Sequence, residues 1–369
     1  MSDARKVNRV ITGYLQQVLG GTVRDSHIHA LALMITGLVR GKSSHFEKIG
    51  AKSGARAKYP SRVKQIQRFN KNRHVRYESH YLPFVELVLA SLGLTEFRLS
   101  IDTSQVGRNC LMLTLGLVYK QRVIPLAWLV FKGKKGHSSA DKQLALLQQV
   151  RDLLPADAQV ILTGDGEFDG TEVVTWLEAQ PTWEYACRTA KNIKVRASLS
   201  VDWHTLEEIA PPAGQNRQLN QLYFTGQDVG PVNIAFIWHP EQGEHIYLVT
   251  SAQTLDQTRR WYTRRFKIET LFADTKSRGF GLDKSGIRHT KRMERFVIAV
   301  FIAYIWMIYL GVLVIQDNNL GLIARTDRFM HSLFQLGRLY LDRLLEDDWP
   351  IPVSLQLPHP RSFIHVVLV

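Results

Sequence analysis

The hydrophobic residues in the first quarter of the chain recur with the period of a helix. Residues 28–39 (IHALALMITGLV) form a dense apolar run, and Val63, Ile66 and Phe69 lie three residues apart in a later, polar segment. Apolar positions at this spacing occupy one face of a helix. We therefore predict helices over both segments, with a shorter helix at residues 45–49 between them.

From residue 96 to residue 182 the apolar positions are grouped in short runs rich in Leu, Val, Ile and aromatic residues. Three such runs separated by short polar turns predict an antiparallel meander. A helix, a further buried run and a second helix follow, and this alternation is typical of an α/β domain. The expected strands are residues 97–102, 111–119, 122–131 and 159–165, and the expected helices are residues 142–154 and 170–179.

The pattern changes again over residues 183–252, where short apolar runs are separated by Gly, Pro and Asn. This predicts a β-rich insertion. Thr254 and Gln257 then have the spacing of a capping box, which predicts that a helix begins there and continues to about residue 277. A C-terminal helix at residues 327–346 and an irregular tail from Pro350 are expected after it. The expected strands of the insertion are residues 183–188, 221–226, 232–238 and 246–251.

Residues 296–315 form a run of twenty residues without a charge. That length is sufficient to span a membrane, so a membrane-associated protein is one interpretation. However, Tyr304, Trp306 and Tyr309 lie near the centre of the run, whereas spanning helices carry Trp and Tyr mainly at their ends. We therefore expect a helix that is buried on all sides in a protein core, and a protein without a membrane partner.

The distribution of charge along the chain indicates what kind of partner it binds. The chain has 369 residues and a formal net charge of +14. Residues 40–76 hold twelve Lys and Arg against one acidic residue, and residues 259–295 hold twelve against four, so the remainder of the chain is mildly acidic. Two separate basic segments favour a nucleic acid over a membrane surface as the partner, although two solvated helix faces would give the same count.

The N-terminal basic segment has the order of a short helix, a turn and a basic helix, which is typical of helix-turn-helix DNA readers. Its exposed cations would contact phosphates, and those predicted to do so are Arg62, Lys64, Arg68, Lys71 and Arg73. Two further basic groups are left open between DNA contact and solvated surface. They are the loop at residues 132–139 and the cluster of Arg288, Lys291, Arg292 and Arg295.

Composition and motifs also exclude several classes of protein. Hydrophobic residues at 45% and charged residues at 22% are globular proportions, which exclude a disordered or fibrous protein. The two cysteines, Cys110 and Cys187, are too few for a disulfide scaffold. No phosphate-binding loop or dinucleotide fingerprint is present, so use of ATP or NAD is not indicated.

Three acidic residues stand at positions suited to metal binding. Asp102 is expected to end the first strand, Asp165 to end the strand at residues 159–165, and Glu269 to lie on the helix after the insertion. Acids at the ends of neighbouring strands point into one crevice, where their oxygens can share divalent cations. Two such ions activate a water or a 3′-hydroxyl and stabilise the leaving oxygen of a phosphodiester.

The helix that carries Glu269 strengthens this interpretation. At 100° per residue, Tyr262, Arg265, Glu269 and Lys276 fall within a stripe of about 60°. A carboxylate flanked by two cations and a phenol suits phosphoryl transfer on DNA. An ordinary surface face with pairing of Arg265 and Glu269 is the alternative.

With these residues the sequence resembles the DDE transposases of the insertion sequence four family. The matching pieces are Asp102 in LSIDTS, Asp165 in DGEF and the Tyr-Arg-Glu-Lys signature, within roughly residues 25–315. The resemblance implies an α/β fold: an RNase H-like catalytic core with a β-rich insertion, an N-terminal helical DNA-binding domain and C-terminal helices. The corresponding boundaries are 1–95, 96–182, 183–252, 253–315 and 316–369.

The resemblance also implies metal-dependent DNA cleavage and strand transfer in cut-and-paste transposition, often through hairpin ends. Asp102, Asp165 and Glu269 would hold two Mg²⁺ or Mn²⁺ ions. The remaining signature residues, Tyr262, Arg265 and Lys276, would hold DNA phosphates near the cleaved end.

Relatives often stack a Trp of the insertion on a flipped base. The matching position here is Ile246-Tyr247, which has no Trp. Tyr247, His245 and Trp238 are therefore the candidates to take this role.

The expected partners are double-stranded DNA, as terminal inverted repeats and as target, and a second copy of the chain in a homodimer. The expected location is the cytoplasm, in association with a prokaryotic nucleoid. The alternative function is a catalytically inactive, transposase-derived regulator, which would bind DNA without cutting it.

Overall fold

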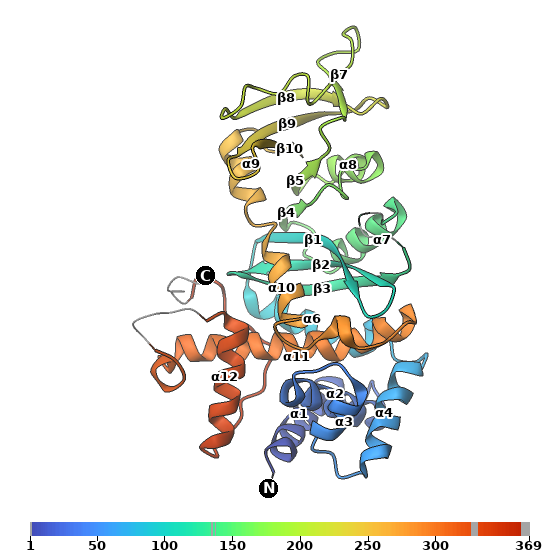
Figure 1. Ribbon diagram of the computed structural model, residues 1–369, viewed down its shortest axis with the longest axis vertical. Helices are drawn as coiled ribbons and strands as arrows, with labels where there is room; N and C mark the ends of the chain where they lie inside the picture. Colours follow the sequence, from blue (N-terminus) through green and yellow to red (C-terminus); the bar gives the residue numbers. More distant parts are fainter. Residues whose placement is uncertain (1, 134–135, 137, 326–330, 363–369) are drawn as a thin grey trace.

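The computed structural model describes residues 2–133, 136, 138–325 and 331–362. Figure 1 shows an elongated molecule with N-terminal helices at one end, the long helix α11 (Thr290–Gln316) across it, and a sheet that continues to the other end. The N-terminal helices lie on one side of α11 and the sheet on the other. α11 is therefore the core element shared by both parts.

The strands form one sheet with the order β3-β2-β1-β4-β5-β10-β9-β8-β6-β7 in the described part of the chain. β1 (Glu96–Val106), β2 (Cys110–Tyr119) and β3 (Arg122–Phe131) form the expected antiparallel meander. β4 (Gln159–Gly164) pairs in parallel with β1, and β5 (Trp183–Thr189) pairs in parallel with β4. Three antiparallel strands followed by two parallel ones in this order are the RNase H-like arrangement, so the expected fold class is confirmed.

β5 differs from the expectation in the part of the fold to which it belongs. The predicted insertion boundary at residue 183 falls before this strand, whereas its pairing with β4 makes it the fifth strand of the core. Its buried and half-buried residues resemble those of the insertion strands. The sequence shows an apolar run but not the strand with which it pairs. A core strand and an insertion strand therefore look alike in the sequence.

The insertion continues the core sheet and does not form a separate one. β10 pairs antiparallel with β5, and β9 and β8 follow in order, as the strands expected at residues 221–226, 232–238 and 246–251. Figure 1 shows this part at the end of the molecule opposite the N-terminus. Its strands are β6 (Lys194–Arg196), β7 (His204–Thr205), β8 (Arg217–Phe224), β9 (Val229–His239) and β10 (Glu244–Thr250).

The expected helices form two groups, one across α11 from the sheet and one packed on the sheet. Helix α2 buries its apolar run against α1, α3, α4 and α11, and α7 and α8 pack against the sheet. Their positions agree with the hydrophobic pattern to within a few residues. The bounds are α1 (Asp3–Leu19), α2 (Asp25–Gly41), α3 (Phe46–Lys52), α4 (Tyr59–Lys71), α5 (Tyr77–His80), α6 (Leu82–Leu92), α7 (Ala140–Arg151) and α8 (Thr171–Glu178).

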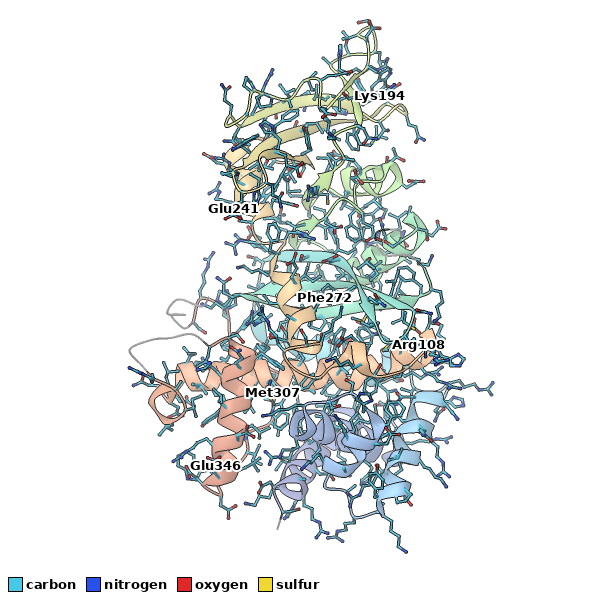
Figure 2. All side chains as sticks on the ribbon, in the orientation of Figure 1. Arg108, Lys194, Glu241, Phe272, Met307 and Glu346 are labelled. Atoms are coloured by element: carbon cyan, nitrogen blue, oxygen red, sulfur yellow. The ribbon has the colours of Figure 1, made fainter. Side chains whose placement is uncertain are left out.

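Helix α11 is long and apolar enough to cross a membrane by length and composition, but 83% of its apolar window is buried inside the protein. It contacts β3, α2, α4 and α12, so the expectation of a buried core helix is confirmed. Two glycines permit its close crossing with α12, since a Cβ on Gly311 would lie 1.9 Å from the Leu333 carbonyl oxygen and one on Gly337 1.8 Å from that of Met307. Figure 2 labels Met307 near this crossing.

The C-terminal helix α12 (Leu333–Glu346) begins with a capping box formed by Ser332 and Gln335. The helix was expected to begin at residue 327, and residues 326–330 lie outside the described residues. The tail from residue 350 to residue 362 contains no helix or strand, in agreement with the expected irregular tail.

The single helix expected over residues 254–277 is two helices. It begins with the predicted capping box of Thr254 and Gln257. It is then divided into α9 (Leu255–Tyr262) and α10 (Lys267–Thr275) by a turn. The prediction of one continuous helix is therefore wrong.

The turn has a tighter hydrogen-bond pattern than a helix. Arg265 donates its N–H to the Tyr262 carbonyl, and Glu269 donates to that of Phe266, three residues back instead of four. The carbonyl of Arg265 accepts a hydrogen bond from Ser100 Oγ of β1 at 3.1 Å. Because this carbonyl is bonded to the sheet, the chain bends where it crosses β1.

Candidate active site

Two of the predicted acids come from neighbouring parallel strands. Ser100 of β1 is opposite Thr163 of β4, so Asp102 and Asp165, each two residues further on, lie beside each other. Asp165 directly follows β4 as expected. β1 continues to Val106, however, so the prediction that Asp102 ends its strand is wrong. The reason is that the hairpin of β1 and β2 extends past the end of β4.

The third acid, Glu269, lies on the first turn of α10, and one guanidinium joins all three acids. Arg265 Nη2 lies 3.2 Å from Asp165 Oδ2 and 3.8 Å from Asp102 Oδ2, and Arg265 Nη1 lies 3.0 Å from Glu269 Oε1. The side chain of Asp102 is 10% exposed and that of Glu269 is 56% exposed. The structure thus brings the three acids together around one cation. Asp102 is the buried member of this cluster and Glu269 the exposed one.

Burial, and then the neighbouring Asp165, raise the pKa of Asp102 from 3.8 to about 7. Arg265 acts in the opposite direction, as does the Thr103 backbone N–H, which donates to Asp102 Oδ1 at 2.7 Å. Without a further cation, Asp102 therefore holds a proton for much of the time near neutral pH. Proton release from Asp102 is coupled to whatever positive charge enters the site.

The donor atoms of this cluster fit a divalent cation. Three carboxylates share one guanidinium, and carboxylate oxygens are hard ligands suited to Mg²⁺ or Mn²⁺. As the side chains stand, no three His, Cys, Asp or Glu residues in the described part of the chain are grouped closely enough to hold one ion. Arg265 lies between the acids, and its buried Nε has no hydrogen-bond partner among the described residues.

The break between α9 and α10 separates the other signature residues. Tyr262 ends α9 with 5% exposure and packs in a small apolar cluster with residues of β5, β9 and β10. Burial raises the pKa of Tyr262 to about 12, so its hydroxyl stays neutral. Lys276 follows α10 and contacts Ser104 Oγ of β1. The four residues expected on one helical stripe therefore come from two helices and the segments that follow them, and Arg265 contacts all three acids.

A cavity of about 560 Å³ opens beside Asp165 and Arg265. Arg188 and Lys191, at and after the end of β5, line it. Sequence reasoning missed both cations because it assigned β5 to the insertion. A basic residue near the end of an apolar strand beside that of Asp165 was the available signal.

The aromatic candidates for base stacking lie on the far side of the same cavity. His245 and Tyr247 of β10 line it. Trp238 of β9 packs edge-on against His245 with ring centroids 5.0 Å apart. The insertion thus supplies two aromatic rings to the cavity wall and a third behind them.

The predicted N-terminal DNA contacts lie elsewhere, on α4 and just after it. Figure 1 shows α4 on the opposite side of α11 from the sheet. Lys64, Arg68, Lys71 and Arg73 are exposed. Arg62 is partly buried, and its guanidinium donates to the Ala57 carbonyl at 2.7 Å, which holds the loop before the helix. Of the five predicted cations, four are therefore available on the surface and one supports the local fold.

Comparison with known proteins gives a family for this fold and site. Residues 103–306 match the family described as "Transposase DDE domain". The structure is similar to that of a chain in the "Cryo-EM structure of piggyBac transposase synaptic complex with hairpin DNA", with a TM-score of 0.47, 11% sequence identity, and coverage of 94% of this chain and 80% of that chain. No curated protein matches the sequence.

The matched segment spans more than half of the chain and includes the turn and helices that carry Arg265 and Glu269. It begins one residue after Asp102 and contains Asp165. The chain therefore belongs to the Transposase DDE domain family.

Proposed function

We propose that the protein is a cut-and-paste transposase of the insertion sequence four family. It binds the terminal inverted repeats of a DNA element and catalyses strand cleavage and strand transfer. The observation that carries the proposal is the convergence of Asp102, Asp165 and Glu269 on Arg265. Membership of a transposase family supports the same reaction class.

Asp102, Asp165 and Glu269 are the residues that would hold Mg²⁺ or Mn²⁺, with two ions in each site. When bound, such ions supply activation of a water or a 3′-hydroxyl and stabilisation of the leaving oxygen. Asp102 must release its proton to act as a ligand, because burial raises its pKa to about 7. Arg265 must give way, because its guanidinium now forms the ion pairs that these carboxylates would exchange.

The residues around the acids would position the DNA. Tyr262 offers a neutral hydroxyl at the cavity wall, and Arg265 and Lys276 offer cations near the acids. These groups suit a phosphate next to the cleaved bond. In a route through hairpin ends, His245 or Tyr247 would stack on a base turned out of the distorted duplex. Two copies of the chain would hold the paired ends in the DNA complex.

The test uses a supercoiled plasmid that carries the gene for this chain with its chromosomal flanks. The wild-type protein is expected to nick or cut the flanks in the presence of Mg²⁺. Asp102→Asn is expected to lower the rate about 10²-fold or more, since a metal ligand is lost. Asp157→Asn is the matched control, because Asp157 is exposed in a turn far from the acids.

Three outcomes separate the interpretations. Loss of cleavage in Asp102→Asn alone supports the transposase. Cleavage at equal rates by the wild type and Asp102→Asn contradicts it. Tight binding to the flanks without cleavage by the wild type would identify the inactive regulator.

A further inference from the structure

The two basic segments of the sequence meet at one place in the fold. The end of α4 and the start of α11 enclose a cavity of about 470 Å³, which we call the junction groove. Asn70 and Lys71 line one side, and Arg288 and Arg292 line the other. Lys71 comes from the N-terminal basic segment and the two arginines from the second one. Figure 1 shows α4 beside the start of α11, and the two helices are in contact.

The cations of the junction groove are available to a ligand. Lys71 and Arg288 are exposed and Arg292 is half-buried, and none of the three side chains has a hydrogen bond or ion pair with another described residue. Glu47 is the one acidic residue of the wall within the described ranges. The groove therefore has an excess of positive charge that nothing in the described chain neutralises.

Two neutral features point to the same kind of ligand. Asn70 is 1% exposed, and both polar atoms of its amide are buried without a hydrogen-bond partner among the described residues. The start of α11, a helix of 27 residues, adds the partial positive charge of its free N–H groups. Amide donors, helix starts and cationic side chains are the groups that contact phosphates in nucleic acids.

Arg295 differs from the free cations because it holds the groove together. Its Nη1 donates to the Asn70 carbonyl at 3.1 Å, and its Nε donates to the Val75 carbonyl at 3.3 Å. The rings of Phe46 and Phe296 pack with centroids 5.6 Å apart and join α3 to α11. The walls are therefore fixed by contacts in which the free cations take no part.

Lys132 and Ser138, two described residues of the loop after β3, lie beside the two cavities. Lys132 Nζ donates to the Arg288 carbonyl at 2.6 Å. At the other end of this loop, the Ser138 backbone N–H contacts the Glu167 carboxylate. Glu167 lines the active-site cavity together with Asp165. Lys132 thus lies next to the junction groove, and Ser138 lies next to the active-site cavity.

A further cation stands near the same junction. Arg108, in the turn between β1 and β2, is exposed, and its backbone N–H donates to the Ile287 carbonyl at 2.9 Å. Figure 2 shows it beside the start of α11. This turn follows the strand that carries Asp102, and Arg108 adds a further exposed cation beside the groove.

We propose that the junction groove binds the sugar-phosphate backbone of the DNA duplex on which the active site acts. The inference rests on the proposed function, because it takes DNA as the partner. Lys71, Arg288 and Arg292 contact phosphates, and the duplex continues past Lys132 to the active-site cavity. Binding at both places by one duplex fixes the distance between the N-terminal contacts and the cleaved bond.

The test compares two double variants of the full chain that lose the same charge. Arg288→Ala/Arg292→Ala removes the free arginines of the groove. Arg5→Ala/Arg9→Ala removes two exposed arginines of α1, which lies away from α4 in Figure 1. Binding of a duplex of about 30 base pairs is measured by fluorescence anisotropy between about 50 and 200 mM NaCl.

Each lost phosphate contact reduces the magnitude of the negative slope of log K against log salt by about 0.9. The groove variant is therefore expected to lose about 2 from this slope and to bind about 10-fold or more weakly at about 100 mM NaCl. The α1 variant is expected to stay within about twofold of the wild type. Both variants should melt like the wild type. If the groove variant does not fold, Lys71→Gln, with an expected slope change of about 1, takes its place.

The outcomes distinguish this inference from the proposed function. If the wild type binds DNA and the groove and α1 variants bind equally well, the groove inference fails and the proposed function stands. If the wild type does not bind duplex DNA, both fail. If an RNA duplex of the same sequence binds the wild type more tightly than DNA, and only the groove variant loses this preference, the surface belongs to RNA and the inference is overturned.

Discussion

Two ion clusters at the two ends of α10 have inverse composition. At the start of the helix, Arg265 contacts three carboxylates. Near its end, Asp274 Oδ2 lies 3.1 Å from Arg122 Nε of β3, and the charges of Arg278 and Arg338 also act on Asp274. One cluster has three acids and one base, and the other has one acid and three bases.

Burial separates the two clusters further. The side chains of Arg122 and Asp274 are 8% and 4% exposed, whereas that of Glu269 is 56% exposed. Burial raises the pKa of Asp274 to about 6, although Arg122 lowers it. The buried cluster attaches α10 to β3. The open cluster has excess negative charge and accepts further cations. The difference shows that a buried ion pair holds one end of α10 against β3, while the acids at the other end keep an excess of negative charge.

Breaking the buried pair should have the largest effect on stability. Arg122→Met leaves the Asp274 carboxylate buried without its contacting partner, and removal of one member of such a pair costs about 3–5 kcal/mol of unfolding free energy. Urea denaturation measures the loss. The double variant Arg122→Met/Asp274→Leu should recover most of it, because no buried charge of the pair remains. A loss below about 1 kcal/mol in the single variant would show that this pair does not hold α10.

Removing the charge of Asp102 should raise the free energy of unfolding, whereas Arg122→Met lowers it. The pKa of Asp102 is raised in the folded protein to about 7, so its contribution to stability is fully present below the unfolded pKa of 3.8 and is lost as pH rises through 7. Asp102→Asn imitates the protonated form. In EDTA it should be more stable than the wild type by about 2–4 kcal/mol at pH 8.

This gain should shrink steadily as the pH falls from 7 toward 4, where the wild type is itself protonated in both states. Urea denaturation at several pH values gives the curve. Asp157→Asn, at an exposed turn, should show no such trend. A gain that is the same at pH 8 and pH 4 would contradict an unbalanced charge at Asp102.

Removing Arg265 should strengthen metal binding and weaken DNA cleavage. Arg265→Met frees the three carboxylates from their competing guanidinium. Loss of Arg265 also raises the pKa of Asp102, so binding is compared at a pH well above 7. If the ion pairs contribute about 1 kcal/mol, Mn²⁺ should then bind about 5-fold more tightly, as measured by electron paramagnetic resonance of free Mn²⁺. DNA cleavage should fall, because Arg265 also positions a phosphate. Arg260→Met, an exposed arginine of α9, is the control and should change neither.

These clusters also show what the sequence can and cannot predict. The core strands and the two strand acids follow from apolar runs bounded by polar turns. The turn between α9 and α10 does not, because the helical period continues through it and the bend involves Ser100, 165 residues away in sequence. A helical projection shows Arg265 near Glu269 but not near Asp102 or Asp165, since those contacts require the assembled sheet.

The sequence of the basic segments also predicts only part of what their residues do in the fold. Their charge predicts an anionic partner, and the exposed residues of α4 follow from its helical period. That Lys71 lies across one groove from Arg288 and Arg292 depends on the packing of α11 against α4. Arg62 and Arg295 look like their basic neighbours in the sequence, yet both donate to backbone carbonyls. Composition cannot separate a cation that supports the fold from one that is available.

The smallest change in unfolding free energy is expected at an exposed ion pair of α11. Lys291 Nζ lies 3.0 Å from Glu294 Oε2 on the first turn of α11, and the Lys291 side chain is 74% exposed. Solvent screens this attraction, and a Lys near a helix start opposes the helix dipole. Lys291→Ala should therefore change the unfolding free energy by less than about 0.5 kcal/mol in urea denaturation. A loss as large as that of Arg122→Met would mean that burial is not what separates the clusters of α10 from an ordinary surface pair.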